Sequence, residues 1–208
     1  PGSHMKEGYQ WAVRLVDPTG AAAQVAPGTP HPGRYPADGL TATALPARSD
    51  AGGLHIVLVP LEYNYDGSGR LPDTSPTQLA IIEELMLHLY PIAHIRLEVH
   101  DPIPWSDSPT WTGNFDFGDL NEYLSDLRVA ENAPDDSYYY GLVQPDDSFS
   151  EYCGGSCVTG QSYVVSSPGN ADWRAGSGLG FSGERWAWTL AHEVGHAIQD
   201  QQAYRPLR

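Results

Sequence analysis

A β-branched run, a capped helix and a second apolar run follow one another in the middle of the chain, and this order constrains the fold most. Residues 54–61 are rich in Val, Ile and Leu, which is typical of a buried strand. Ser75-Pro76-Thr77-Gln78 then supplies an N-cap, a proline at the first helical position and a glutamine three residues after the cap. The amphipathic helix ends at Pro91, and residues 92–99 alternate as a second strand. Strand, helix and strand predict a right-handed parallel unit.

The remaining elements extend the same pattern. We predict a helix over about residues 116–132, a third central strand over 137–143 and a further strand over 162–165. A last helix begins near Gly183, with Ser182 as its N-cap. The fold class expected from this order is α/β (α+β), with a twisted mixed sheet and helices in a single domain.

The domain organisation follows from composition. Residues 1–5, Pro-Gly-Ser-His-Met, read as a cloning remnant, which removes His4 from the candidate site residues. Residues 6–50 are a Pro/Gly/Ala-rich N-terminal extension with strand-like pieces at 9–16 and 41–45. This extension is either an edge hairpin of the main domain or the tail of an upstream domain. Residues 51–208 are expected to form the main domain, with a truncated or altered C-terminal end.

The charge balance excludes several classes of partner. A net charge of −15 and a pI near 4.6 disfavour nucleic acids and anionic membranes, because binding phosphate needs clustered Lys and Arg. The longest apolar run is far too short to cross a membrane. A single Lys among 22 Gly and 18 Pro suits a loop-rich secreted protein, and we expect a monomer.

The chemistry is concentrated in His192-Glu193-Val194-Gly195-His196, near the end of the chain. Residues four apart lie on one face of a helix, so His192 and His196 can present two imidazoles to one metal ion. Glu193 lies one position round the helix, where its carboxylate can act as general base toward water. Two histidines alone are more often part of a polar helix face, but the intervening Glu favours a zinc site, with Zn²⁺ as the expected cofactor.

Both cysteines fall in one loop. Cys153 and Cys157 are separated by three small residues, a spacing that allows a tight local disulfide. Such a bridge adds little global stability but fixes the shape of its loop, and it implies export. A second metal site or a redox pair is the alternative, although no third Cys is present.

These motifs resemble the metzincin clan of zinc endopeptidases. The segments that carry the resemblance are the Gly178–Glu184 approach, the His192–His196 motif, the Tyr139-Tyr140-Gly141 strand and the Tyr152–Cys157 loop, and they look closest to secreted bacterial members related to mucin-cleaving proteases. The resemblance implies a zincin-like fold and a cleft in which an extended peptide pairs with an edge strand. It also implies that zinc polarises the scissile carbonyl while Glu193 deprotonates the attacking water.

The chain departs from the clan pattern after His196. Clan members carry a glycine three residues later and a third zinc-binding histidine three residues beyond that, where this sequence has Gln199 and Gln202. Asp200 is the only later carboxylate side chain, and it is a poor candidate for the third ligand.

The sequence therefore predicts a secreted zinc endopeptidase that acts on extracellular proteins or glycoproteins. The alternative is a catalytically inactive zincin-like domain that serves as a binding or scaffold module. A metal-dependent hydrolase of another amide also stays open, because the motif selects the chemistry and the cleft selects the substrate.

Overall fold

The computed structural model describes residues 53–90, 92, 94–107, 115–167 and 169–198, together with the backbone of four short strands nearer the N-terminus. The chain divides into two compact units, Pro1–Ala51 and Gly52–Arg208. In the first unit, β1 (Gln10–Trp11) pairs antiparallel with β4 (Thr43–Ala44), and β2 (Val13–Arg14) pairs antiparallel with β3 (Arg34–Tyr35). The rest of the N-terminal extension lies outside the described residues.

The second unit is built on a sheet with the strand order β6-β5-β8-β10-β9, and β7 pairs with the far end of β5. Its strands are β5 (Leu54–Tyr63), β6 (Ile95–Val99), β7 (Ile103–Trp105), β8 (Ser137–Val143), β9 (Gly160–Ser162) and β10 (Ala175–Leu179). All described pairings in this sheet are parallel except that of β9 with β10. The predicted α/β fold class and the mixed sheet are thus confirmed.

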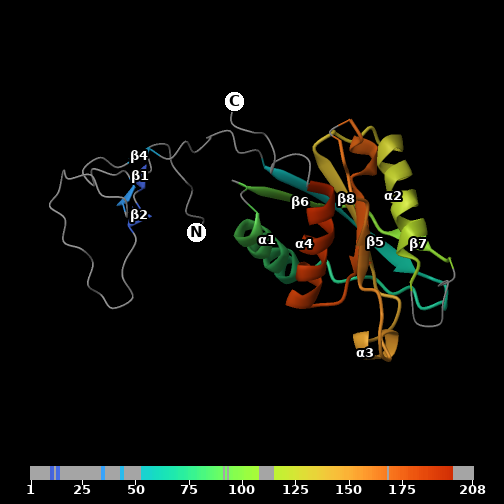
Figure 1. Ribbon diagram of the computed structural model, residues 1–208. Coiled ribbons are helices and arrows are strands. Elements are labelled where there is room, and N and C mark those ends of the chain that lie inside the picture. Colours follow the sequence, from blue (N-terminus) through green and yellow to red (C-terminus); the bar gives the residue numbers. More distant parts are fainter. Residues whose placement is uncertain are drawn as a thin grey trace. The chain divides into compact units, whose positions relative to one another are not determined.

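Helices cover both faces of this sheet. They are α1 (Pro76–Leu89), α2 (Phe117–Ala130), the single turn α3 (Phe149–Tyr152) and α4 (Glu184–Ile198), with a 3-10 turn η1 (Ala171–Trp173). Figure 1 shows α1 and α4 on one face and α2 on the other. The predicted Ser75 cap forms, since its side chain accepts from the Gln78 backbone amide. The structure adds a cap at Asp116, whose side chain accepts from the Gly118 backbone amide.

The sheet separates two apolar layers. Alternate residues of β5 and β8, such as Ile56 and Tyr140, pack against α1 and α4, whereas Val59 and Val143 pack on the α2 side. Both central strands are buried on both faces, as parallel strands between helices usually are. This arrangement holds α4 against the sheet by its apolar stripe.

Three boundaries differ from the sequence-based prediction. The first is that of β6, which begins at Ile95 and not at residue 92. The strand expected at residues 162–165 lies at Gly160–Ser162, because β10 pairs through its glycines with Gly160 and Ser162. Val164 is 64% exposed, and Val165 is buried in the core although it lies beyond the end of the strand. At the start of α4, Gly183 precedes the first helical residue with a φ of 108°, and the Ser182 side chain hydrogen-bonds Asp73. Ser182 is therefore not the residue next to the helix.

A polar network joins the residues that follow β6 and α2 to strand β8. The Glu131 carboxylate accepts from the Tyr139 hydroxyl at 2.6 Å and lies 2.9 Å from His100 Nε2, while His100 Nδ1 lies 2.6 Å from the Asp101 carbonyl oxygen. Both partners of His100 only accept, so both bonds require the doubly protonated ring. Burial lowers the pKa of His100, but these bonds outweigh it and the pKa is raised. The pKa of Glu131 is lowered, chiefly by the Tyr139 bond.

This network predicts a pH dependence of stability. Because the folded pKa of His100 is raised, its contribution is complete below its ordinary value of 6.5 and is lost as the pH rises through the folded value. The Glu131 contribution is present above its ordinary value of 4.5 and is lost as the pH falls through the lowered folded value. In the wild-type protein, the free energy of unfolding should fall between about pH 6 and pH 8 as His100 loses its proton. We expect this fall to be smaller by up to ~1 kcal/mol in His100→Gln, a modest amount because solvent screens the pair. Urea titrations measure this, and His88→Gln, at an exposed position of α1, should leave the pH dependence unchanged.

None of the described helices combines the length and apolar character needed to cross a membrane.

Candidate active site

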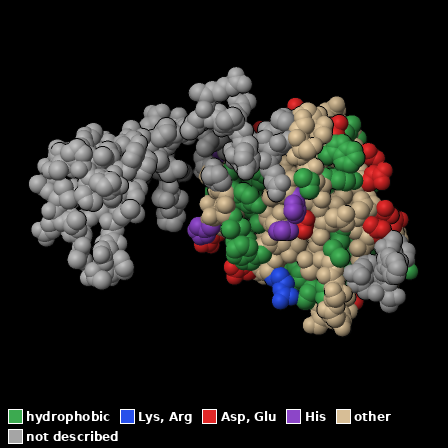
Figure 2. Space-filling view, in the orientation of Figure 1, with side chains coloured by type: hydrophobic (Ala, Val, Ile, Leu, Met, Phe, Trp, Pro, Cys, Tyr) green, Lys and Arg blue, Asp and Glu red, His purple; other side chains and the backbone are tan. Residues whose placement is uncertain are grey.

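Helix α4 carries the two predicted metal ligands on the side that faces away from its apolar stripe. The stripe lies in the core and consists of Ala187, Leu190, Ala191, Val194, Ala197 and Ile198. His192 is exposed and His196 is half-buried, so both rings reach solvent while the helix stays anchored. Figure 2 shows histidine side chains at the surface over α4. The structure therefore places both rings where an ion can approach them.

The two rings converge. His192 Nε2 and His196 Nε2 lie 3.2 Å apart, and the rings are nearly perpendicular with centroids 4.8 Å apart. A tetrahedral zinc with Zn–N bonds of about 2.0–2.1 Å separates two ligand nitrogens by about 3.3 Å. Neither ring has another hydrogen-bond partner within the described part of the chain. The spacing thus fits two ligands of one zinc ion, although a hydrogen bond between two neutral rings would give a similar distance.

Glu193 lies beside this pair but points into the protein. It is only 8% exposed, and its Cγ lies 3.0 Å from where a Cβ on Gly160 of β9 would stand. Burial raises the pKa of the Glu193 carboxyl, and the neighbouring His192 and His196 partly offset that rise. A carboxylate with a raised pKa is a stronger base than an exposed one, which suits proton transfer from water.

Helix α4 is fixed at this turn by the end of α1. The Tyr90 hydroxyl donates to the Ala191 carbonyl oxygen at 2.5 Å. A Cβ on Gly195 would lie 2.6 Å from that hydroxyl, so the glycine inside the motif makes room for Tyr90. This contact, between residues far apart in sequence, holds the turn that carries His192 and His196.

A strip without side chains lies under α4, and sequence reasoning missed it. Gly176 and Gly178 of β10 face the same side of the sheet as Tyr140 of β8, and Gly178 pairs directly with Gly160 of β9. A Cβ on Gly160 would lie 2.8 Å from the Thr189 methyl of α4. Gly160 and Gly178, which form this glycine strip, let α4 lie directly on β9 and β10. The alternation Gly176-Ser177-Gly178 is the sequence signal that could have revealed it, since period two marks one face of a strand.

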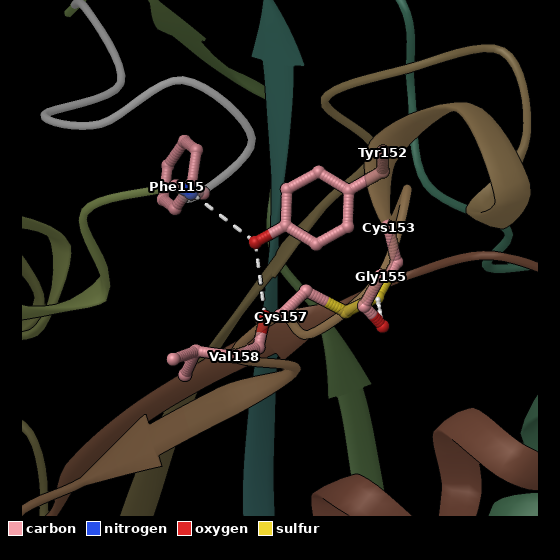
Figure 3. The surroundings of a disulfide bond; sticks show 6 residues. All are labelled: Phe115, Tyr152, Cys153, Gly155, Cys157 and Val158. Atoms are coloured by element: carbon pink, nitrogen blue, oxygen red, sulfur yellow. Dashed lines mark hydrogen bonds between the residues drawn. A yellow bond between two sulfur atoms is a disulfide. The ribbon is translucent and has the colours of Figure 1, made fainter.

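The approach to β9 is braced by the cysteine loop. The structure joins Cys153 to Cys157 in a disulfide with a Cα–Cα distance of 5.4 Å. Figure 3 shows that the Tyr152 hydroxyl accepts the Phe115 amide at 3.1 Å and donates to the Val158 carbonyl oxygen at 2.9 Å. Val158 lies two residues before Gly160, so this bond and the disulfide restrain the segment that leads into β9. Gly160, the first residue of β9, packs against Glu193.

The other histidines stay apart from the pair. His55 lies 3.3 Å from Glu98, His100 belongs to the Glu131 network, and His88 and His94 are exposed. The loop after β5 contains Asn64, Asp66 and Ser68, but their spacing lacks the closing Glu of an EF-hand and favours a solvated turn. The Arg70 guanidinium bonds Asp66 and lies 3.1 Å from the Asp147 carboxylate.

No candidate for a third metal ligand is found among the described residues. Residues 53–90, 92, 94–107, 115–167 and 169–198 contain no set of three His, Cys, Asp or Glu side chains placed to hold a metal. Gln199, Asp200 and Gln202, which follow the motif, lie outside this part of the chain.

Comparison of the sequence with protein-family models gives no match, and neither does a search of curated proteins. The arguments for function therefore rest on the geometry of α4, β9 and β10.

Proposed function

We propose that this protein is a secreted zinc-dependent endopeptidase of metzincin type. The observation that carries the proposal is the convergence of His192 Nε2 and His196 Nε2 at 3.2 Å beside a buried carboxylate on the same helical turn. Three side chains of one short segment thus supply two nitrogen ligands and a base. The disulfide between Cys153 and Cys157 is compatible with an extracellular site of action.

In this proposal His192 and His196 hold zinc. When bound, the metal polarises the scissile carbonyl and makes water more acidic. Glu193 takes the proton from the attacking water and then passes it to the leaving amine, which balances the hydrolysis of the peptide bond. Burial raises the pKa of the Glu193 carboxyl, so its carboxylate accepts a proton from water more readily than an exposed one does.

Strand β9 is the proposed docking edge for substrate. It ends the described strand order, runs antiparallel to β10 and begins at Gly160, which packs against Glu193. An extended peptide that pairs along β9 would bring its backbone past the catalytic carboxylate. The substrate class is therefore an extended segment of an extracellular protein or glycoprotein.

Zinc binding can be tested apart from catalysis. Adding zinc to metal-free protein should raise Tm by about 5–10 °C at a hundredfold excess over Kd, because a ligand of the folded state stabilises it. Differential scanning fluorimetry should show that His192→Ala and His196→Ala each abolish this rise. The control His88→Ala removes an isolated exposed histidine and should keep it.

The same measurement addresses the alternative function. A binding or scaffold module without a metal is favoured by Gln199 and Gln202, which stand where the clan has a glycine and a third ligand. If zinc leaves Tm of the wild-type protein unchanged, that alternative replaces the peptidase. An equal rise in His192→Ala would mean that zinc binds elsewhere.

A further inference from the structure

Tyr140 of β8 carries a hydroxyl in a position that the fold leaves unexplained. The residue is 1% exposed, and its hydroxyl has no hydrogen-bond partner among the described residues. A buried hydroxyl without a partner is costly, and most native structures avoid it. The side chain therefore stands ready to donate to an acceptor in its surroundings.

The glycine strip determines where this hydroxyl points. A Cβ on Gly178 would lie less than 3.0 Å from the Tyr140 hydroxyl oxygen, so the side chain crosses β10 through the space that Gly178 leaves open. The Thr189 methyl lies 3.3 Å from the same Cβ position and 2.8 Å from that of Gly160. The hydroxyl thus enters the strip that Gly178 and Gly160 form beneath α4.

Glu193 reaches the same strip from α4. Its Cγ lies 3.0 Å from the Cβ position of Gly160, and Gly160 pairs with Gly178. Burial is the main cause that raises the pKa of Tyr140, and the charge of the Glu193 carboxylate is the second. This second cause requires the two groups to lie close together in a medium of low dielectric constant. Within the described residues the Glu193 carboxylate has no hydrogen-bond donor.

Other donors are already engaged. The Thr189 hydroxyl donates to the Arg185 carbonyl oxygen at 3.3 Å, and the Tyr90 hydroxyl donates to Ala191. Arg174 Nε is the other buried donor without a partner among the described residues, but Arg174 packs on Tyr138 and is not among the charges that shift the pKa of Glu193. Tyr140 is thus the unpaired donor near the Glu193 carboxylate. We propose that Tyr140 is a positioning residue whose hydroxyl donates to the Glu193 carboxylate, directly or through one water in the glycine strip. Its role in catalysis rests on the proposed function of Glu193, whereas the pairing itself does not.

A double-mutant cycle in thermal stability tests the pairing without turnover or metal. Tyr140→Phe should lower Tm by about 3–10 °C in the wild-type background, because the buried Glu193 carboxylate then loses its hydrogen-bond donor. In a Glu193→Leu background the same change should leave Tm unchanged or raise it. Equal effects of Tyr140→Phe in both backgrounds would overturn the pairing.

Tyr138 offers a matched control. It lies two residues earlier on the same face of β8, is also buried, and its ring packs against Arg174. Tyr138→Phe should change Tm equally in both backgrounds. A coupling to Glu193 of the same size as that of Tyr140 would show a general effect of the core and would overturn the proposal.

Kinetics provide a readout that a purely structural role would not move. With a cleaved peptide, Tyr140→Phe should lower kcat by about 10- to 100-fold with little change in KM, because the base is misoriented while the substrate still docks. If the wild-type protein cleaves peptides but the cycle shows no coupling, the pairing fails and the peptidase proposal stands. If no peptide is cleaved, the cycle still decides the pairing.

Discussion

Glu193→Gln should lower peptide turnover by about 10²- to 10⁴-fold, the usual contribution of a general base. The amide has nearly the same shape as the carboxyl group but cannot take a proton from water. Zinc content should stay nearly unchanged, because His192 and His196 supply the nitrogens and Glu193 points into the protein. Cleavage of a fluorogenic peptide library with and without chelator, together with metal analysis, measures both effects.

The same helix supplies a control for this variant. Glu184 in the first turn of α4 is exposed and accepts from Trp188 Nε1 at 3.3 Å. Glu184→Gln should keep turnover close to that of the wild-type protein. Turnover that survives Glu193→Gln, or cleavage that a chelator does not affect, would contradict the assignment of Glu193 as base of a zinc peptidase.

Gly178→Ala should lower the free energy of unfolding by about 1–3 kcal/mol, the usual cost of overpacking a core. The new Cβ would lie less than 3.0 Å from the hydroxyl of Tyr140, whose rigid ring is buried, and 3.1 Å from the Thr159 carbonyl oxygen. Either β10 or α4 must therefore move, and α4 carries His192 and His196. Urea unfolding measures the stability, and zinc binding reports whether the site moves.

Two further variants make this result specific. The double variant Gly178→Ala with Tyr140→Phe should recover part of the loss, since the hydroxyl oxygen in the way is gone. Gly155→Ala in the cysteine loop has no atom within 4 Å of its new Cβ and should be neutral or slightly stabilising through the unfolded chain. Wild-type stability of Gly178→Ala would show that the strip under α4 can widen freely.

Local sequence signals located most of the secondary structure. The Ser75 cap, the apolar run at residues 54–61 and the helix expected over residues 116–132 all correspond to elements close to the predicted bounds. Each of these signals acts within one turn or one strand, so it does not depend on distant residues. The side chain of Gln78 shows the limit. Instead of bonding back to its own cap, it forms two hydrogen bonds with Gly183 at the start of α4, at 2.7 and 3.1 Å.

The surroundings of the candidate site could not be predicted in the same way. Neither the contact of Tyr90 with Ala191 nor the pairing of Gly160 with Gly178 leaves a pattern in a single segment. Strand β9 was misplaced because the apolar residues Val164 and Val165 suggested a strand, whereas pairing with β10 selects Gly160–Ser162. The residues of β9 that pair with β10 are therefore selected by the close approach of α4, which requires glycine at Gly160, and not by hydrophobicity.

The sequence by itself determined the candidate chemistry, because His192, Glu193 and His196 lie within two turns of one helix and their spacing depends only on helical geometry. The tertiary structure decided the rest. It buries Glu193 against β9, points the Tyr140 hydroxyl through the gap at Gly178, and fixes α4 through Tyr90. These contacts join five separate segments of the chain, and only packing of the folded sheet and helices brings them to one place.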